Sequence, residues 1–130
     1  LSRSFVAVDS VVLKLAEKHK WSSGSTAAVC VTFAGRVFSA NAGDAEIVLG
    51  TKRGMEDDAR HQVVLLSECH KPFSTAKDQK SVSKREHNRI RRAGGRVIFG
   101  RVMGTLAVSR ALGDISFKAK HNGAAEDFVS

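Results

Sequence analysis

The chain has 130 residues, of which 42% are hydrophobic and 26% are charged. This composition excludes an intrinsically disordered segment and indicates one globular domain or part of a larger one. The 21 Lys and Arg against 13 Asp and Glu give a net charge of +8, which favours an anionic partner: a phosphoprotein, a nucleic acid or an acidic membrane.

The first predicted element is a helix over residues 4–20, with Ser2 or Ser4 as its N-cap. It is expected to end in the polar residues 21–24. The apolar residues that recur at helical spacing along it are Phe5, Val8, Val12, Leu15 and Ala16.

Three antiparallel strands are predicted next, as a meander over residues 25–33, 36–42 and 46–50. The dipeptide Ala34-Gly35 supplies the first turn and Gly43-Asp44 the second. Cys30 lies in the apolar run "AAVCVTF" and is expected to be a buried small hydrophobe. With Cys69 it makes two cysteines, too few for a disulfide framework and without metal-ligand spacing. A reducing compartment, cytoplasmic or nuclear, is therefore expected.

The second half alternates polar loops with short elements. Residues 51–62 and 72–81 are predicted as loops, with a short strand at 63–66 between them. Residues 83–93 are predicted as a basic helix that starts with a Ser83/Glu86 capping box and stops at Gly94-Gly95. A strand follows at 97–99, and residues 105–108 form either a strand or a buried turn. The pattern fits an α+β fold or a layered sandwich of sheets and helices better than a parallel sheet.

Asp44 is the first candidate functional residue. A carboxylate at a sharp glycine corner can point off the sheet edge toward a hard cation. The simpler alternative is a turn aspartate that bonds its own backbone, and composition alone favours that alternative.

The basic residues between Lys77 and Arg101 fit either a phosphate or nucleic-acid surface or a solvated helix face. No aromatic residue is interleaved before Phe99, so the solvated face is favoured. The five histidines lack zinc-site spacing, and His70 is expected to be a structural residue near a turn. Ser25 and Ser109 have no evident catalytic partners in the sequence.

The segment "RVMGTLAVSRALGD", residues 101–114, is the most distinctive. Its glycines permit unusual backbone angles and its apolar residues supply core. Arg110 either pairs with Asp114 and holds the turn, or faces a phosphate with its planar guanidinium. The pairing is favoured.

Together these segments resemble the metal-dependent serine/threonine protein phosphatases of type 2C. The matching stretches occur in that family's order and cover most of the chain: "W-SSGSTAAVCV", "VFSANAGDAEIVL", "HKP", "NRIRRAGGRVI" and "RVMGTLAVSRALGD..FK". The resemblance implies an antiparallel β-sandwich flanked by helices, the four-layer αββα arrangement, present here in part. It also implies two or more Mg²⁺ or Mn²⁺ ions and a water that attacks the phosphoserine or phosphothreonine phosphorus.

The resemblance also implies which functional residues the chain holds. Asp44 matches the aspartate of the family's Gly-Asp-Ser-Arg corner, an accessory metal ligand, although here the corner is Gly-Asp-Ala-Glu. The other metal-binding aspartates fall in motifs outside residues 1–130, so no catalytic residue is expected in this partial domain. Met55-Glu56-Asp57 imitates a family motif in the wrong chain order and is interpreted as coincidence or a surface insert. The residues expected to support the fold as a structural motif are Gly43, Ser109, Arg110, Gly113 and Asp114.

The sequence is compatible with three functions. The first is hydrolysis of phosphoserine and phosphothreonine by the whole protein, with a phosphoprotein as substrate and no nucleic-acid or membrane partner; the isolated segment is expected to be inactive. The second is a pseudophosphatase, an interaction domain that keeps the fold without catalysis, for which the altered corner is the support. The third is a nucleic-acid-binding module, which the net charge favours and which predicts affinity that falls steeply with salt.

Overall fold

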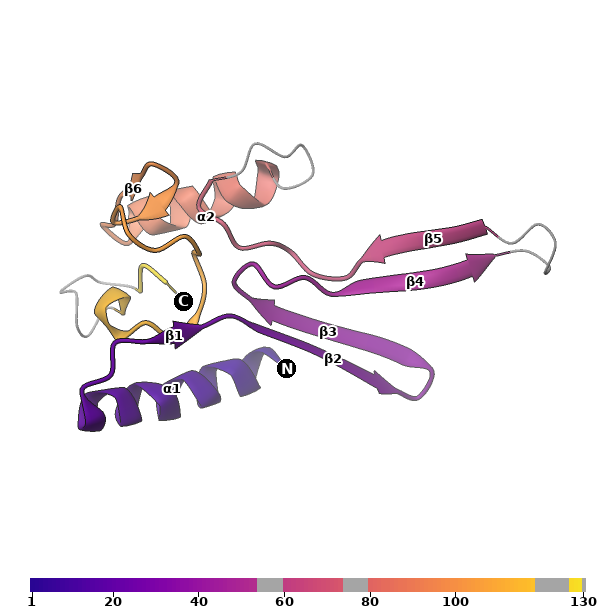
Figure 1. The fold of residues 1–130 in the computed structure, drawn as a ribbon, viewed down its shortest axis with the longest axis horizontal. Coiled ribbons are helices and arrows are strands. Elements are labelled where there is room, and N and C mark those ends of the chain that lie inside the picture. Colours follow the sequence, from indigo (N-terminus) through magenta and orange to yellow (C-terminus); the bar gives the residue numbers. More distant parts are fainter. Residues whose placement is uncertain (54–59, 74–79, 119–126, 130) are drawn as a thin grey trace.

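The computed structural model describes residues 1–53, 60–73, 80–118 and 127–129 (Figure 1). All strand pairs in these ranges are antiparallel, and helices accompany them, which confirms the predicted α+β class. The elements in chain order are α1 (Ser2–His19), β1 (Gly24–Ser25), β2 (Ala27–Phe33), β3 (Arg36–Ala42), β4 (Val48–Arg53), β5 (Arg60–Leu65), α2 (Lys80–Arg92), β6 (Val97–Ile98), β7 (Arg101–Val102), β8 (Leu112–Gly113) and the 3₁₀ helix η3 (Ile115–Phe117).

Helix α1 forms where the apolar periodicity predicts it. It begins at Ser2, with Leu1 at the N-cap position and no side-chain cap, so the predicted serine cap is wrong. It ends where Lys20 takes the left-handed conformation, with φ 59°, and donates its N–H to the Ala16 carbonyl. The helix packs against β8 and η3, elements about a hundred residues further along the chain.

Strands β2 and β3 form a tight hairpin with register Ala27↔Ala42 to Phe33↔Arg36. Both turn residues, Ala34 and Gly35, have positive φ, as a type I′ turn requires. The predicted meander is wrong beyond this point, because β4 pairs with β5 rather than with β3.

Strands β4 and β5 make a second hairpin, with register Val48↔Leu65 to Arg53↔Arg60. The prediction of a loop over residues 51–62 is therefore wrong at both ends: residues 51–53 belong to β4 and residues 60–62 belong to β5. Its polar residues pair through their backbones, and Lys52, His61 and Gln62 are exposed, so their polarity reflects solvent contact and not the absence of a strand. The middle of β3 contacts the residue that follows β5, where the Ser39 hydroxyl donates to the Leu66 carbonyl at 2.6 Å.

The hairpins carry large exposed apolar side chains, among them Phe33, Val48 and Val63. Cys30 is also exposed, so the prediction that it is buried is wrong. Each hairpin is a two-stranded sheet, and a pair of strands alone cannot cover both of its faces.

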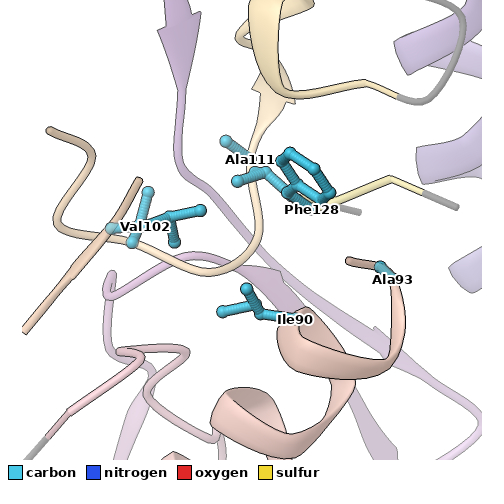
Figure 2. Close-up of a cluster of buried hydrophobic side chains, with 7 residues drawn as sticks. Ile90, Ala93, Val102, Ala111 and Phe128 are labelled. Carbon is cyan, nitrogen blue, oxygen red and sulfur yellow. The ribbon is translucent and has the colours of Figure 1, made fainter. Parts of the chain in front are cut away.

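The core lies between α2 and the C-terminal part of the chain (Figure 2). Gly95 lets the chain approach this core, since a Cβ there would press on Ile90 and Phe128. Residues 105–108 form neither a strand nor a fully buried turn: Leu106 is bridged to Val102, Val108 is buried, and Thr105 and Ala107 are exposed. The buried cluster consists of Ile90, Ala93, Val102, Val108, Ala111, Phe128 and Val129.

Helix α2 begins at Lys80, three residues before the predicted start. Ser83 and Glu86 are therefore inside the helix, and the predicted capping box is wrong. Both are buried, at 5% and 4% exposure. Of the basic residues predicted to form a solvated helix face, Lys84, Arg85, Arg91 and Arg92 are exposed.

Candidate functional site

The Gly43-Asp44 corner is built by a glycine that cannot be replaced without strain. Gly43 has φ +91°, and a Cβ there would collide with the Thr26 side chain. Its carbonyl accepts the His70 N–H at 2.9 Å, which joins the corner to the "HKP" segment. The corner thus brings Asp44 close to the segment that contains His70, which lies 26 positions later in the sequence.

The Asp44 carboxylate lies 3.2 Å from the Lys71 ammonium. Its side chain is 34% exposed and that of Lys71 is 45% exposed. A pair this exposed contributes about 0–1 kcal/mol to stability. The pair therefore does not lock Asp44, and its carboxylate keeps access to solvent.

The residues present do not fit a complete metal centre. No group of three or more His, Cys, Asp or Glu in the described ranges is arranged to hold a metal ion. Asp44 contributes a single carboxylate, whereas Mg²⁺ requires near-octahedral oxygen coordination. Its role as an accessory ligand stays a prediction, and Met55-Glu56-Asp57 lies outside the described residues.

A buried ion-pair cluster lies near the Gly43-Asp44 corner and is centred on Glu86 of α2. Both Glu86 oxygens accept from Arg110, at 2.7 Å from Nη2 and 3.1 Å from Nε, and Arg89 Nη2 approaches at 3.1 Å. The favoured Arg110–Asp114 pairing is therefore wrong. Burial raises the pKa of the Glu86 carboxyl, but the hydrogen bond from Arg110 and the charges of Arg89 and Arg110 outweigh it, so the pKa lies below its usual value.

Ser109 contributes to this cluster through its backbone. It is fully buried, its N–H donates to the His70 carbonyl at 2.9 Å, and its carbonyl accepts from Arg89 at 2.6 Å. Ser109 therefore ties the 101–114 segment to α2 and to the "HKP" segment.

Gly113 and Asp114 belong to a second buried cluster, which joins the C-terminal segment to α1. Asp9 accepts the Gly113 N–H at 2.7 Å with one oxygen and the Lys118 ammonium at 3.0 Å with the other. Lys118 is 2% exposed and also donates to the Ala111 carbonyl. A Cβ on Gly24 would collide with the Asp114 carboxyl group, so the chain needs a glycine there.

The Asp114 carboxyl has a raised pKa, because burial and the neighbouring Asp9 charge outweigh the attraction of Lys118. The residue itself takes the left-handed conformation, with φ 50°, and donates its N–H to the Ser23 carbonyl. The structural role of Gly113 and Asp114 stays a prediction, and the sequence pattern gave no sign of Asp9 and Lys118 as their neighbours.

A cavity of about 570 Å³ separates α1 from β3 and reaches both clusters. Its polar lining includes Asp9, Asn41, His70 and Arg110, and Phe5 is part of its apolar lining. Asp44 is not among the lining residues. The two candidate features, the Asp44 corner and this cavity, are therefore neighbours joined by His70.

His70 is the buried titratable group between them. Asn41 Nδ2 lies 3.4 Å from its Nδ1 and also donates to the Glu68 carbonyl at 2.6 Å. Burial lowers the pKa of His70, the charge of Arg110 lowers it further, and Glu86 and Glu68 oppose the shift. The folded protein therefore favours the neutral imidazole, as expected for a structural histidine.

We expect the free energy of unfolding to depend on pH through His70. Its folded pKa lies below the unfolded value of about 6.5, so its contribution is fully present above that pH. It is lost as the pH falls through the lower folded pKa, by at most about 1.4 kcal/mol per pH unit for one proton. Urea unfolding between pH 7.5 and 5.5 measures this slope. The slope should be smaller in His70→Gln, and an equal slope in both proteins would contradict the prediction.

An antiparallel α+β framework with a carboxylate corner and two buried ion-pair clusters defines a structural class but no activity. The sequence pattern of the family described as Protein phosphatase 2C matches residues 1–130. The chain therefore belongs to the protein phosphatase 2C family, which confirms the resemblance. The corner, the "HKP" segment and residues 101–114 are the family-like segments that the structure brings together.

Curated relatives agree with this assignment. Protein phosphatase 2C homolog 3 of Schizosaccharomyces pombe is 41% identical over 118 residues, which are 91% of this chain and 24% of that protein. Protein phosphatase 2C 57 of Arabidopsis thaliana is 34% identical over 125 residues, 94% of this chain and 29% of the relative. The integrin-linked kinase-associated serine/threonine phosphatase 2C of Bos taurus is 35% identical over 117 residues, which are 88% of this chain and 29% of that protein.

The chain thus spans about a quarter of the length of the relatives that it matches. Within the described residues, neither helix has the length and apolar character that a membrane crossing needs.

Proposed function

We propose that these residues are part of a protein serine/threonine phosphatase that hydrolyses phosphoserine and phosphothreonine with a metal-activated water. Membership of the protein phosphatase 2C family is the observation that carries the proposal. Paired Mg²⁺ or Mn²⁺ ions supply such a reaction with an activated water and neutralise phosphoryl charge. The activity is proposed for the whole protein, with a phosphoprotein as substrate.

The described residues would act as the frame of that site. Gly43 fixes the corner, His70 and Ser109 join it to the 101–114 segment, and Glu86 with Arg110 joins that segment to α2. We place no reacting group among them. Asp44 has the charge and the partial exposure to approach a cation.

Replacing Asp44 with asparagine in the whole protein tests this role. We expect phosphate release from a phosphothreonine peptide to fall about tenfold at limiting Mn²⁺, because one carboxylate near the cation is lost, and to recover in part at saturating Mn²⁺. The matched control is Glu46→Gln, which removes the other acid of the corner. Equal activity of Asp44→Asn and the unaltered protein at every Mn²⁺ concentration would contradict the ligand role.

The second candidate is a pseudophosphatase. The Asp44–Lys71 pair favours it, because Lys71 partly neutralises the carboxylate on which the accessory metal role depends. Calorimetric titration of the whole protein with Mn²⁺ separates the candidates. Tight binding supports the phosphatase, and no measurable heat supports the pseudophosphatase.

A further inference from the structure

A second cavity, of about 440 Å³, lies along the first half of α2 and has no part in the proposed phosphatase frame. Pro72 and Phe73 form its other wall. The helix residues that line it recur at positions i, i+3, i+4, i+7 and i+8, so they share one face of α2. They are Lys80, Ser83, Lys84, His87 and Asn88.

Ser83 supplies the observation that points to a ligand. The residue is 5% exposed, and its hydroxyl has no hydrogen-bond partner among the described residues. A serine inside a helix commonly bonds the preceding turn, and a buried hydroxyl without any partner is costly. A ligand with oxygen acceptors in the cavity would satisfy it.

The positive charge beside the cavity favours an anionic ligand. Lys80 and Lys84 are exposed and lie one helical turn apart, and no acid in the described ranges pairs with either. Arg85, the next residue on the helix, is by contrast paired with Glu68 at 2.6 Å. Lys80 is the first residue of α2, and the helix dipole also favours negative charge at that end of the helix.

The apolar wall of the cavity favours an anionic ligand that also has an apolar part. Phe73 is 61% exposed, so its ring offers carbon surface in the cavity opposite the lysines. A phosphothreonine or phosphoserine side chain has the matching two ends, an apolar stem and a phosphate with about two negative charges. We propose that this cavity binds a phosphorylated Ser or Thr side chain of a peptide, at a site distinct from the Asp44 corner.

The proposal deepens the proposed function, since it gives a phosphoprotein substrate or partner a second point of attachment. It does not depend on hydrolysis, because the lining residues lie outside the proposed frame of the phosphatase site. Binding can therefore be measured in EDTA, where metal-dependent hydrolysis does not proceed.

The test is fluorescence anisotropy of the whole protein in EDTA with a labelled phosphothreonine peptide and its unphosphorylated counterpart. We expect the phosphopeptide to bind at least about tenfold more tightly. Ser83→Ala and the double variant Lys80→Gln/Lys84→Gln should each weaken its binding about tenfold. The matched control is Lys14→Gln, an exposed lysine on α1, which should leave binding unchanged.

Thermal unfolding checks each variant. Ser83→Ala removes an unpartnered hydroxyl, so its melting temperature should stay the same or rise. Equal affinity for the two peptides, or full phosphopeptide binding by Ser83→Ala and by the double variant, would overturn the proposal. Loss of binding to a single-stranded RNA in the double variant without loss of phosphopeptide binding would also overturn it and assign the lysines to nucleic acid.

Hydrolysis of p-nitrophenyl phosphate with Mn²⁺ separates this proposal from the proposed function. The double variant should hydrolyse this small ester at the unaltered rate. If the unaltered protein fails to hydrolyse it but binds the phosphopeptide as described, the proposed function fails and the cavity proposal stands. If hydrolysis is normal and the phosphopeptide preference is absent, the cavity proposal alone fails.

Discussion

Replacing Arg110 with methionine is expected to lower the free energy of unfolding by about 3 kcal/mol. Methionine keeps much of the volume but removes both hydrogen bonds that Arg110 donates to the Glu86 carboxylate, which is 4% exposed. The loss should not reach the upper range for buried pairs, because Arg110 is itself about a third exposed and Arg89 remains near Glu86. Urea unfolding of the protein followed by circular dichroism measures the change.

The matched control is Arg85→Met, on the same helix as Glu86. Arg85 also pairs with a glutamate, Glu68, but both side chains are more than half exposed. That variant should lose no more than about 0.5 kcal/mol. Equal losses in the two variants would show that burial of Glu86 does not determine the contribution of Arg110.

The second large effect is expected at Lys118. Replacing it with methionine should cost about 3–4 kcal/mol, because Asp9 loses its cation and the Ala111 carbonyl loses a donor in a buried site. These bonds join the C-terminal segment to α1 across 109 residues. Their loss should therefore also raise hydrogen exchange at α1 amides.

The double variant Asp9→Asn/Lys118→Met provides the control. Asparagine keeps an oxygen that can accept the Gly113 N–H and removes the charge that would otherwise stay unpaired. We expect it to recover about half of the stability lost in the single Lys118 variant. Strictly additive losses would contradict the buried pairing.

Local patterns predicted local structure well. The apolar periodicity predicted α1, and the Ala34-Gly35 turn predicted the antiparallel β2–β3 hairpin. The partners of single charged side chains were not predictable in this way. Arg110 and Glu86 are 24 residues apart, and Asp9 and Lys118 are 109 apart, so no short-range spacing marks either pair.

Two of the sequence-based predictions, the capping box of α2 and the burial of Cys30, are wrong for the same reason. Ser83 and Glu86 satisfy the spacing of a capping box, yet α2 begins at Lys80 and buries both, because packing of Ile90 and bonding of Glu86 determine which face turns inward. Cys30 lies in an apolar run that predicts a core strand, but the β2–β3 hairpin leaves it exposed. Tertiary context decides both cases, and a sequence pattern does not contain it.

The family was recognisable from the sequence because several motifs occur together in one order. The corner, the "HKP" segment and residues 101–114 are distant in sequence, and the structure brings them together through His70 and Ser109. The glycine corner made Asp44 one candidate cation ligand, and the resemblance implied its accessory metal role. The described residues leave that role a prediction, because they contain no group of three or more His, Cys, Asp or Glu that could hold a metal ion.

Phosphate release by the whole protein from a phosphothreonine peptide, with Mn²⁺ and with EDTA, tests the central claim most directly. We expect phosphate release to require the divalent cation and to be absent in EDTA. Release of equal rate in EDTA, or none at any Mn²⁺ or Mg²⁺ concentration from a folded protein, would contradict the claim that this chain is part of a metal-dependent phosphatase.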